Sequence, residues 1–308
     1  MNWKTIILRN NDGLKFNNNQ ITLINKKENT KLQFSLDEIN CIILENSHCL
    51  ITSHLLSKLT ENNISLIVTN EKHDPTGLLI SLNQHFSPLS VFRKQLKMTQ
   101  RFKDLLWKKI VQKKIENSCL VLEQQDPKRD LKWIKSQLKK VENGDKTNRE
   151  GAVAKHFFRK LYGKEFVRFA EDNINKTLNY GYKILNSTLS RTIISYGLND
   201  HLGVKHCGPT NWFNLSSDFI EPLRPIVDYW VVNNLSMLEK ENNLSPQVRE
   251  EIAKIIYYPV RINNIKTKIY IAIDIMIKSF ISCLKENRVG KIKLPTLISQ
   301  KPENEEER

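Results

Sequence analysis

Acidic residues and a histidine in separate segments of the chain have the chemistry to hold a divalent metal ion together. The stretch HCGPTNWFNLSSDFIEPLRPIVD at 206–228 contains His206, Asp218 and Glu221, and the stretch NREGAVAKHFF at 148–158 contains Glu150. Carboxylate oxygens are the ligands that Mg²⁺ and Mn²⁺ prefer, and an added imidazole favours Mn²⁺ somewhat. Such an ion can activate an attacking hydroxyl and neutralise charge on a phosphate. These residues therefore indicate metal-dependent chemistry at a phosphate group.

Glu150 has two interpretations that the residues alone leave open. Thr147 followed by Glu150 fits a capping box, in which the glutamate only closes the N-terminus of a helix. Glu150 also shares one helix face with a set of apolar residues, namely Ala154, Phe157, Phe158 and Leu161. A carboxylate on a buried face needs a cation, a metal or a proton, so this second interpretation favours a metal ligand.

Asp218 has a simple structural explanation. Ser216 or Ser217 is placed to cap a helix whose first turn contains Asp218. An acid in the first turn complements the positive end of the helix dipole. Asp218 therefore needs no catalytic role to explain its position in the sequence.

Glu221 is harder to explain in this way because it lies a turn further into the expected helix. Arg224 follows three residues later and is a possible pairing partner, which is a structural alternative to metal binding. Pro222 and Pro225 lack a backbone N–H, so the helix is expected to be irregular there. His206 precedes this helix on a loop, and a lone histidine is more often structural than catalytic.

The elements that carry these residues predict an α+β protein of two domains. Residues 1–85 contain short runs of β-branched residues between turn signals, which is typical of a β-rich, sandwich-like domain with one helix. The segment at 73–88 contains prolines and a glycine and is the candidate linker. Residues 86–296 have apolar residues at helical spacing and are expected to form a larger all-α domain that contains the candidate metal-binding residues. Residues 297–308 are polar and charged and are expected to be a disordered tail.

The expected strands and helices follow from the same patterns. Strands are expected at about 5–8, 14–16, 21–24, 31–36, 39–44 and 64–68. Helices are expected at about 53–63, within 91–122 and 128–140, and at 148–162, 173–196, 217–238, 246–257 and 267–286.

The chain carries a strong excess of positive charge. Its 308 residues include 48 Lys and Arg against 33 Asp and Glu, which gives a net charge of +15. This excess fits a polyanionic partner, either nucleic acid or an anionic membrane surface. For any single lysine, a solvated helix face is the simpler explanation. Basic residues recur over successive helices from 93 to 140, however, and such a broad surface suits DNA phosphates.

The membrane alternative fits less well. The apolar stripes of the helices are needed to build the core of a domain of this size, and no stretch reaches the roughly 18 apolar residues of a membrane span. The N-terminal apolar run is too short for a signal peptide, and the five cysteines show neither zinc nor disulfide spacing. A cytoplasmic protein without a membrane partner is therefore expected.

Three segments, in the same order as in the family, resemble the signature of the CRISPR-associated spacer-acquisition integrases. They are NREGAVAKHFF, NINKTLNYGYKILNSTLSRTI and GVKHCGPTNWFNLSSDFIEPLRPIVD, and the match covers most of 140–230. The wording SSDFIEPLRPIVD is most similar to the type II subfamily. The resemblance implies an N-terminal β domain, followed by a helical domain with the metal site. It carries the metal ligands of the family to Glu150, His206 and Glu221, and leaves Asp218 as a supporting residue or an alternative ligand.

The resemblance also implies an activity and partners. The chain is expected to be a metal-dependent DNA endonuclease and integrase that joins the 3′-hydroxyl ends of foreign DNA fragments into a CRISPR array, with Mg²⁺ or Mn²⁺ as cofactor. The expected partners are double-stranded and branched DNA, a second copy of the chain in a homodimer, and the small subunit of the adaptation pair. The large RNA-guided effector nuclease is a further candidate partner. The alternative is a catalytically idle DNA-binding scaffold of a defence complex, which would show no metal-dependent strand transfer.

Overall fold

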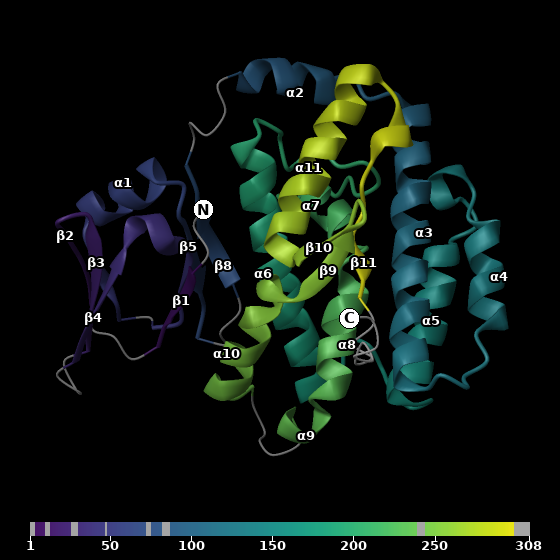
Figure 1. The fold of residues 1–308 in the computed structure, drawn as a ribbon, viewed down its shortest axis with the longest axis horizontal. Coiled ribbons are helices and arrows are strands. Elements are labelled where there is room, and N and C mark those ends of the chain that lie inside the picture. Colours follow the sequence, from purple (N-terminus) through teal and green to yellow (C-terminus); the bar gives the residue numbers. More distant parts are fainter. Residues whose placement is uncertain are drawn as a thin grey trace, which may run out of the picture. The chain divides into compact units, whose positions relative to one another are not determined.

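The computed structural model describes residues 4–9, 13–25, 30–46, 48–71, 75–81, 87–238 and 244–298. The chain divides into two compact units, residues 1–88 with 194–197 and residues 89–193 with 198–308. Strands dominate the first unit and helices dominate the second, as the purple and the teal-to-yellow ribbons of Figure 1 show. The α+β fold class expected from the sequence is confirmed.

The strands of the first unit form two sheets within the described residues. One sheet has the order β1–β5–β7–β8, in which β8 is antiparallel to β7 and the other neighbours are parallel. The other sheet has the order β4–β3–β2–β6, in which only β2 and β6 are parallel. The bounds are β1 Lys4–Leu8, β2 Gly13–Asn17, β3 Gln20–Asn25, β4 Thr30–Ser35, β5 Ile39–Leu44, β6 Leu50–Ile51, β7 Ser65–Thr69 and β8 Pro75–Leu79.

Both sheets of this unit share one hydrophobic core with helix α1 (Ser53–Glu61). Leu8 and Ile42 come from the first sheet, Ile21 from the second and Leu55 from α1, and all four side chains are completely buried. The two sheets and α1 thus bury their apolar side chains in one common core.

Strand β8 corrects the expected linker at 73–88. Pro75–Leu79 pairs with β7, with Leu78 opposite Ile67, although its proline and glycine favoured a connecting segment. A proline is tolerated there because Pro75 is the first residue of a strand at the edge of its sheet. Helix α2 already begins at Pro88, a residue that is favoured in a first helical turn. Residues 82–86 of the expected linker lie outside the described residues.

Helix α3 occupies the middle of the second unit. It contacts α4, α5, α7 and α8, and Figure 1 shows α4 and α5 beside it. None of the helices formed by the described residues is long and apolar enough to cross a membrane. The bounds are α2 Pro88–Leu96, α3 Gln100–Gln125, α4 Lys132–Lys140, α5 Arg149–Tyr162, α6 Asn173–Ser195, α7 Asn214–Phe219, α8 Arg224–Asn233, α9 Leu235–Leu238, α10 Pro246–Ala253 and α11 Ile269–Glu286.

The second unit also contains a small antiparallel sheet, so it is not all-α as expected. Strand β9 (Pro259–Ile262) pairs with β10 (Ile265–Lys268) and with β11 (Thr296–Leu297). Asn263 and Asn264, with φ of 51° and 63°, form the two-residue turn between β9 and β10, a conformation that asparagine adopts readily. Because β11 includes Leu297, ordered structure extends into the expected tail, of which residues 299–308 lie outside the described residues.

Asn117 joins the middle of α3 to two distant segments. Its side chain is completely buried, and Nδ2 donates to the carbonyl oxygens of Pro222 (2.7 Å) and Pro295 (3.0 Å). Its Oδ1 accepts a hydrogen bond from the backbone N–H of Leu297 (3.0 Å). The side-chain amide of Asn117 therefore holds both the segment before α8 and strand β11 against α3 through hydrogen bonds.

Candidate active site

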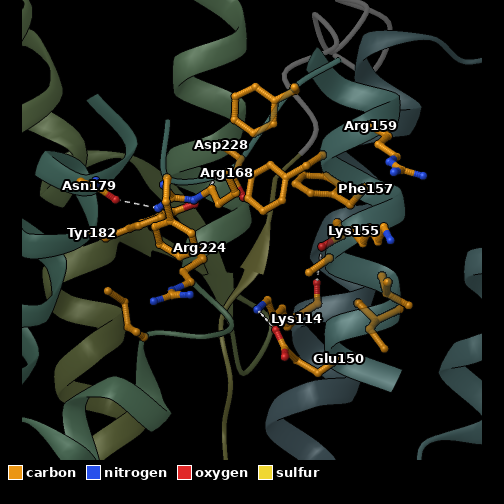
Figure 2. Close-up of a pocket in the computed structure, with 18 of the residues that line it drawn as sticks. Lys114, Glu150, Lys155, Phe157, Arg159, Arg168, Asn179, Tyr182, Arg224 and Asp228 are labelled. Carbon is orange, nitrogen blue, oxygen red and sulfur yellow. Dashed lines mark hydrogen bonds and ion pairs between the residues drawn. The ribbon is translucent and has the colours of Figure 1, made fainter. Parts of the chain in front are cut away.

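Glu150 and Glu221 converge on one cation, the ammonium group of Lys114. Lys114 lies in the second half of α3, and its Nζ donates hydrogen bonds to Glu150 Oε1 and Glu221 Oε2. Figure 2 shows Lys114 and Glu150 approaching each other from α3 and α5. Burial lowers the pKa of Lys114, but the charges of Glu221 and Glu150 outweigh this effect and hold that pKa above its usual value. Two acids predicted from separate segments thus meet at a single positive charge.

Glu150 is free to face Lys114 because other residues cap its helix. Asn148 is the N-cap of α5 and accepts a hydrogen bond from Gly151 N–H (3.2 Å). The carboxylate of Asp145 accepts from the N–H groups of Arg149 (2.9 Å) and Glu150 (3.0 Å). The capping-box interpretation of Thr147 and Glu150 is therefore wrong.

Glu221 lies in the turn between α7 and α8 and is only 4% exposed. The helix expected at 217–238 is interrupted here, consistent with the two prolines in this segment. Besides Lys114, Arg224 contributes a guanidinium nitrogen 3.4 Å from Glu221 Oε1. Burial raises the pKa of Glu221, but Lys114 and Arg224 outweigh it, so the pKa lies below its usual value. Glu221 is consequently a buried carboxylate anion.

His206 is held by Asp218, which is completely buried in α7. Asp218 accepts hydrogen bonds from the backbone N–H groups of Val204, Lys205 and His206, and from Nδ1 of the His206 ring at 2.8 Å. This hydrogen bond raises the pKa of His206, although burial opposes it. Metal-binding histidines commonly use their second ring nitrogen in this way, to fix the orientation of the ring. Asp218 is thus a positioning residue for His206.

Neither Ser216 nor Ser217 is the N-cap of the helix that contains Asp218, contrary to the sequence-based expectation. Helix α7 begins at Asn214, and Phe213 at its N-cap makes no side-chain capping bond. Ser216 instead donates its hydroxyl to Asp200 (3.0 Å), whose carboxylate also accepts the Ser216 N–H (2.7 Å). Asp218 therefore lies in the body of the helix, which lets its carboxylate point at the loop that carries His206.

The predicted ligands are brought together only in part. Glu150 and Glu221 share Lys114, and His206 is close enough to Glu221 for the two charges to affect each other's pKa. Within the described ranges, no three His, Cys, Asp or Glu side chains are arranged so that they could hold a metal ion as they stand. The carboxylates of Glu150 and Glu221 and the imidazole of His206 are donors that suit Mg²⁺ or Mn²⁺. In this structure the Lys114 ammonium supplies the positive charge that both carboxylates require.

Gly203 gives the His206 loop room to approach Asp218. A Cβ atom at this position would lie 2.2 Å from the backbone oxygen of His206 and 2.8 Å from Asp218 Oδ2. We expect Gly203→Ala to lower the free energy of unfolding by about 1–3 kcal/mol, because the loop has to move away from Asp218. Urea denaturation measures this. Gly290→Ala is the control, since its added Cβ meets no atom within 4 Å. Equal stability of both variants would contradict this account of the loop.

A cavity of about 740 Å³ adjoins Glu150 and Lys114. Lys114 and Glu150 lie in its wall together with Arg224, Tyr182 and Asp228, as Figure 2 shows. The Tyr182 ring contacts two guanidinium groups, that of Arg168 at 5.6 Å and that of Arg224 at 4.9 Å from the ring centroid. Cationic and aromatic side chains thus alternate along this wall.

Asp228 gives the second unit a pH-dependent stability. Burial raises the pKa of Asp228 to about 7, against the opposing effects of the Tyr182 hydrogen bond and of Lys114 and Arg224. In the folded protein Asp228 therefore binds a proton more readily than in the unfolded chain, and its contribution to stability falls as the pH rises from about 4 to about 7. We expect Asp228→Asn, which keeps an acceptor for Tyr182, to abolish up to about 4 kcal/mol of this fall. The unfolding free energies of the wild type and of Asp228→Asn are measured across this pH range. Parallel curves for the two proteins would refute the assignment of this pH dependence to Asp228.

Lys114 is the residue of this site that the sequence analysis missed. In the sequence it is one of many lysines in α3, each of which is most simply explained as a solvated charge. Lys114 differs from the others in that it follows Val111 by three residues and precedes Ser118 by four. Both of these neighbours are buried, and Lys114 itself is only 9% exposed. A lysine in register with a buried helix face needs an acidic partner, and this is the signal that could have identified it.

Comparison with known proteins agrees with this architecture. The sequence profile of the family described as "CRISPR associated protein Cas1" matches residues 6–245. A protein named "CRISPR-associated endonuclease Cas1" from Neisseria meningitidis serogroup C is 31% identical over 301 residues, which cover 98% of this chain and 98% of that protein.

Solved structures share the fold at lower sequence identity. A casposase bound to integration product has a TM-score of 0.77 at 20% identity, covering 100% of this chain and 96% of the casposase chain. A chain of a Cas6-RT-Cas1–Cas2 complex has a TM-score of 0.74 at 15% identity, covering 97% of this chain and 36% of that chain. The profile covers well over half of the chain, and the Neisseria relative spans nearly all of it. The chain therefore belongs to the Cas1 family of CRISPR-associated proteins.

Proposed function

We propose that this chain is a divalent-metal-dependent DNA integrase and endonuclease of CRISPR adaptation. The observation that carries the proposal is the convergence of Glu150 and Glu221 on one cation. His206, the third proposed ligand, is anchored by Asp218. The endonuclease name of the Neisseria relative and the casposase of the same fold agree with this chemistry.

The proposed reaction exchanges one phosphodiester bond for another. The 3′-hydroxyl oxygen of a DNA fragment attacks a phosphorus of the array backbone, and a new P–O bond forms as the old one breaks. The displaced strand leaves with a free 3′-hydroxyl, so no external energy source is required. With water as the nucleophile, the same exchange cleaves the strand, which is endonuclease activity.

Glu150, Glu221 and His206 would hold the metal ion in this proposal. Two carboxylates and an imidazole are suitable donors for Mg²⁺ or Mn²⁺. When bound, such an ion supplies positive charge to the phosphoryl oxygens and lowers the pKa of the attacking hydroxyl. Asp218 would keep the His206 ring oriented through Nδ1, and Arg224 would add positive charge beside Glu221.

The adjoining cavity has the composition expected of a site for a single-stranded DNA end. Proteins bind such ends with cationic side chains for the phosphates and aromatic rings on which the bases stack. Phe169 is 81% exposed, and the guanidinium of Arg168 lies 4.6 Å from the centroid of its ring. The backbone φ of Phe169 is 80°, which is rare for a bulky residue, and such conformations often occur at functional sites. We infer that Phe169 presents its ring to a base.

The proposal includes protein partners as well as DNA. Solved Cas1–Cas2 complexes with chains of this fold support a small Cas2-type partner. A homodimer and branched DNA substrates are proposed on the family resemblance. The net charge of +15 supports contact with several DNA phosphates at once.

A strand-transfer assay tests the proposed function. Labelled duplex fragments with free 3′-hydroxyls are mixed with the purified chain, its Cas2-type partner and a plasmid that carries a CRISPR array. We expect label to join the plasmid in Mn²⁺ or Mg²⁺, but neither in EDTA nor with fragments that end in a 3′-dideoxynucleotide. Binding of the fragments without joining in either metal would instead identify a DNA-binding scaffold.

A further inference from the structure

Lys114 is a buried cation that bridges the two carboxylates of the candidate metal site. Only 9% of the residue is exposed, and its Nζ donates to one oxygen of Glu150 and to one oxygen of Glu221. Lysine is almost never buried unless it is paired, because removing its charge from water is costly. These two hydrogen bonds therefore explain why the lysine is tolerated on the inner face of α3.

The ammonium occupies the position in which a divalent ion would be needed. A metal ion held by Glu150 and Glu221 would bind the same two carboxylates that now accept hydrogen bonds from Lys114. Two cations at these oxygens would repel each other strongly in so buried a place. As they stand, the described residues do not bring three His, Cys, Asp or Glu side chains together around a metal ion.

We propose that Lys114 is an exchangeable cation of the metal site, which holds Glu150 and Glu221 together until a divalent ion takes its place. This inference rests on the proposed function, since it requires that the site binds Mg²⁺ or Mn²⁺. Before the metal binds, the lysine prevents the two carboxylates from repelling each other. When the metal binds, the ammonium leaves their oxygens.

The cavity offers the displaced ammonium other acceptors. Lys114, Asn186 and Asp228 all line the cavity. Asn186 Oδ1 is buried and has no hydrogen-bond partner among the residues that the structure describes. Asp228 is a buried acid whose charge already interacts with that of Lys114. The flexible lysine stem can turn toward these groups without unfolding of α3.

The test compares the Mn²⁺ affinities of the wild type and two lysine variants. Electron paramagnetic resonance of free Mn²⁺ measures these affinities on the full chain in the absence of DNA. We expect Lys114→Met to bind Mn²⁺ about tenfold more tightly than the wild type, because no charge-assisted hydrogen bonds have to be broken first. Lys113→Met is the matched control, since it removes the same charge from the preceding residue of α3, whose ammonium pairs with Glu116 and not with the two carboxylates of the site. Unchanged or weaker binding by Lys114→Met would overturn the proposal.

Thermal unfolding provides a second readout that does not depend on activity. Lys114→Met should melt at a lower temperature than the wild type in EDTA, because its two carboxylates lack their cation. Saturating Mn²⁺ should raise its melting temperature more than that of the wild type. An equal or smaller rise in the variant would contradict an exchange of cations.

The wild-type protein supplies a measurement that is independent of how the variant folds. Acetylation of Lys114 by acetic anhydride, followed by mass spectrometry, reports whether its amine is engaged. We expect the modification to increase several-fold when Mn²⁺ is added, while that of Lys113 stays constant. Protection that is unchanged or greater in Mn²⁺ would show that Lys114 stays with the carboxylates and would refute the exchange.

The outcomes separate this inference from the function on which it rests. If the wild type binds no Mn²⁺, both the exchange and the metal-dependent function fail. If the wild type binds Mn²⁺ and loses it in Glu150→Gln, while Lys114→Met binds no more tightly, only the exchange fails.

Discussion

Replacement of Glu221 by glutamine is expected to reduce metal-dependent strand transfer by about a thousandfold, equivalent to about 4 kcal/mol of transition-state stabilisation. Glu221 is buried, and Lys114 and Arg224 together hold its pKa below the usual value, so it supplies a full negative charge. Glutamine keeps the shape and one acceptor oxygen but removes this charge. The strand-transfer assay in Mn²⁺ measures the loss.

The control for this prediction is Glu116→Gln. Glu116 is a more exposed glutamate on α3 that pairs with Lys113, and it lies outside the candidate site. Both variants should bind duplex DNA with the affinity of the wild type, because the basic surface is intact. If Glu221→Gln retained strand transfer within a few-fold of the wild type, Glu221 would not be a metal ligand.

Asp218→Asn is expected to have the second-largest effect. The carboxylate of Asp218 accepts three backbone N–H groups and the ring N–H of His206, and an asparagine amide nitrogen cannot accept any of them. We expect strand transfer and Mn²⁺ affinity to fall by about 10- to 100-fold, as is usual when the partner of a metal-binding histidine is lost. The free energy of unfolding should fall by about 2–4 kcal/mol, since buried donors lose their acceptor.

A titration of His206 by nuclear magnetic resonance distinguishes this positioning role from a purely structural one. Because the hydrogen bond that the His206 ring donates to Asp218 is the main cause of the raised pKa of His206, this pKa should drop in Asp218→Asn. Asp200→Asn is the matched control, as it also removes a buried carboxylate that binds α7 through Ser216. It should destabilise the protein without lowering the pKa of His206. An unchanged His206 pKa in Asp218→Asn would contradict the positioning role.

Local patterns were sufficient to predict most of the fold and part of the site. The spacing of Glu150 relative to Phe157 and Phe158 placed a carboxylate on an apolar helix face, and the structure finds that face against the cavity. The bounds of α6 and α11 also follow closely from their apolar repeats. These features depend only on residues that are close together in the sequence, so they can be predicted from local spacing.

The features that could not be predicted depend on partners far away in the chain. Ser216 seemed to be a helix cap, but the carboxylate that it binds, Asp200, is not recognisable as a partner from local spacing. Strand β8 contains a proline and a glycine, and only its pairing with β7 makes it a strand. The turn at Asn263 and Asn264 is the exception, since two adjacent asparagines between β-branched residues are a local hairpin signal.

The buried amide of Asn117 couples the turn that contains Glu221 to strand β11. Its three hydrogen bonds connect the residue that follows Glu221 to both ends of the stretch from Pro295 to Leu297. A displacement of β11 is therefore transmitted through the Asn117 side chain to the backbone next to Glu221. A protein that docks on β11 would therefore be able to change the geometry around Glu221.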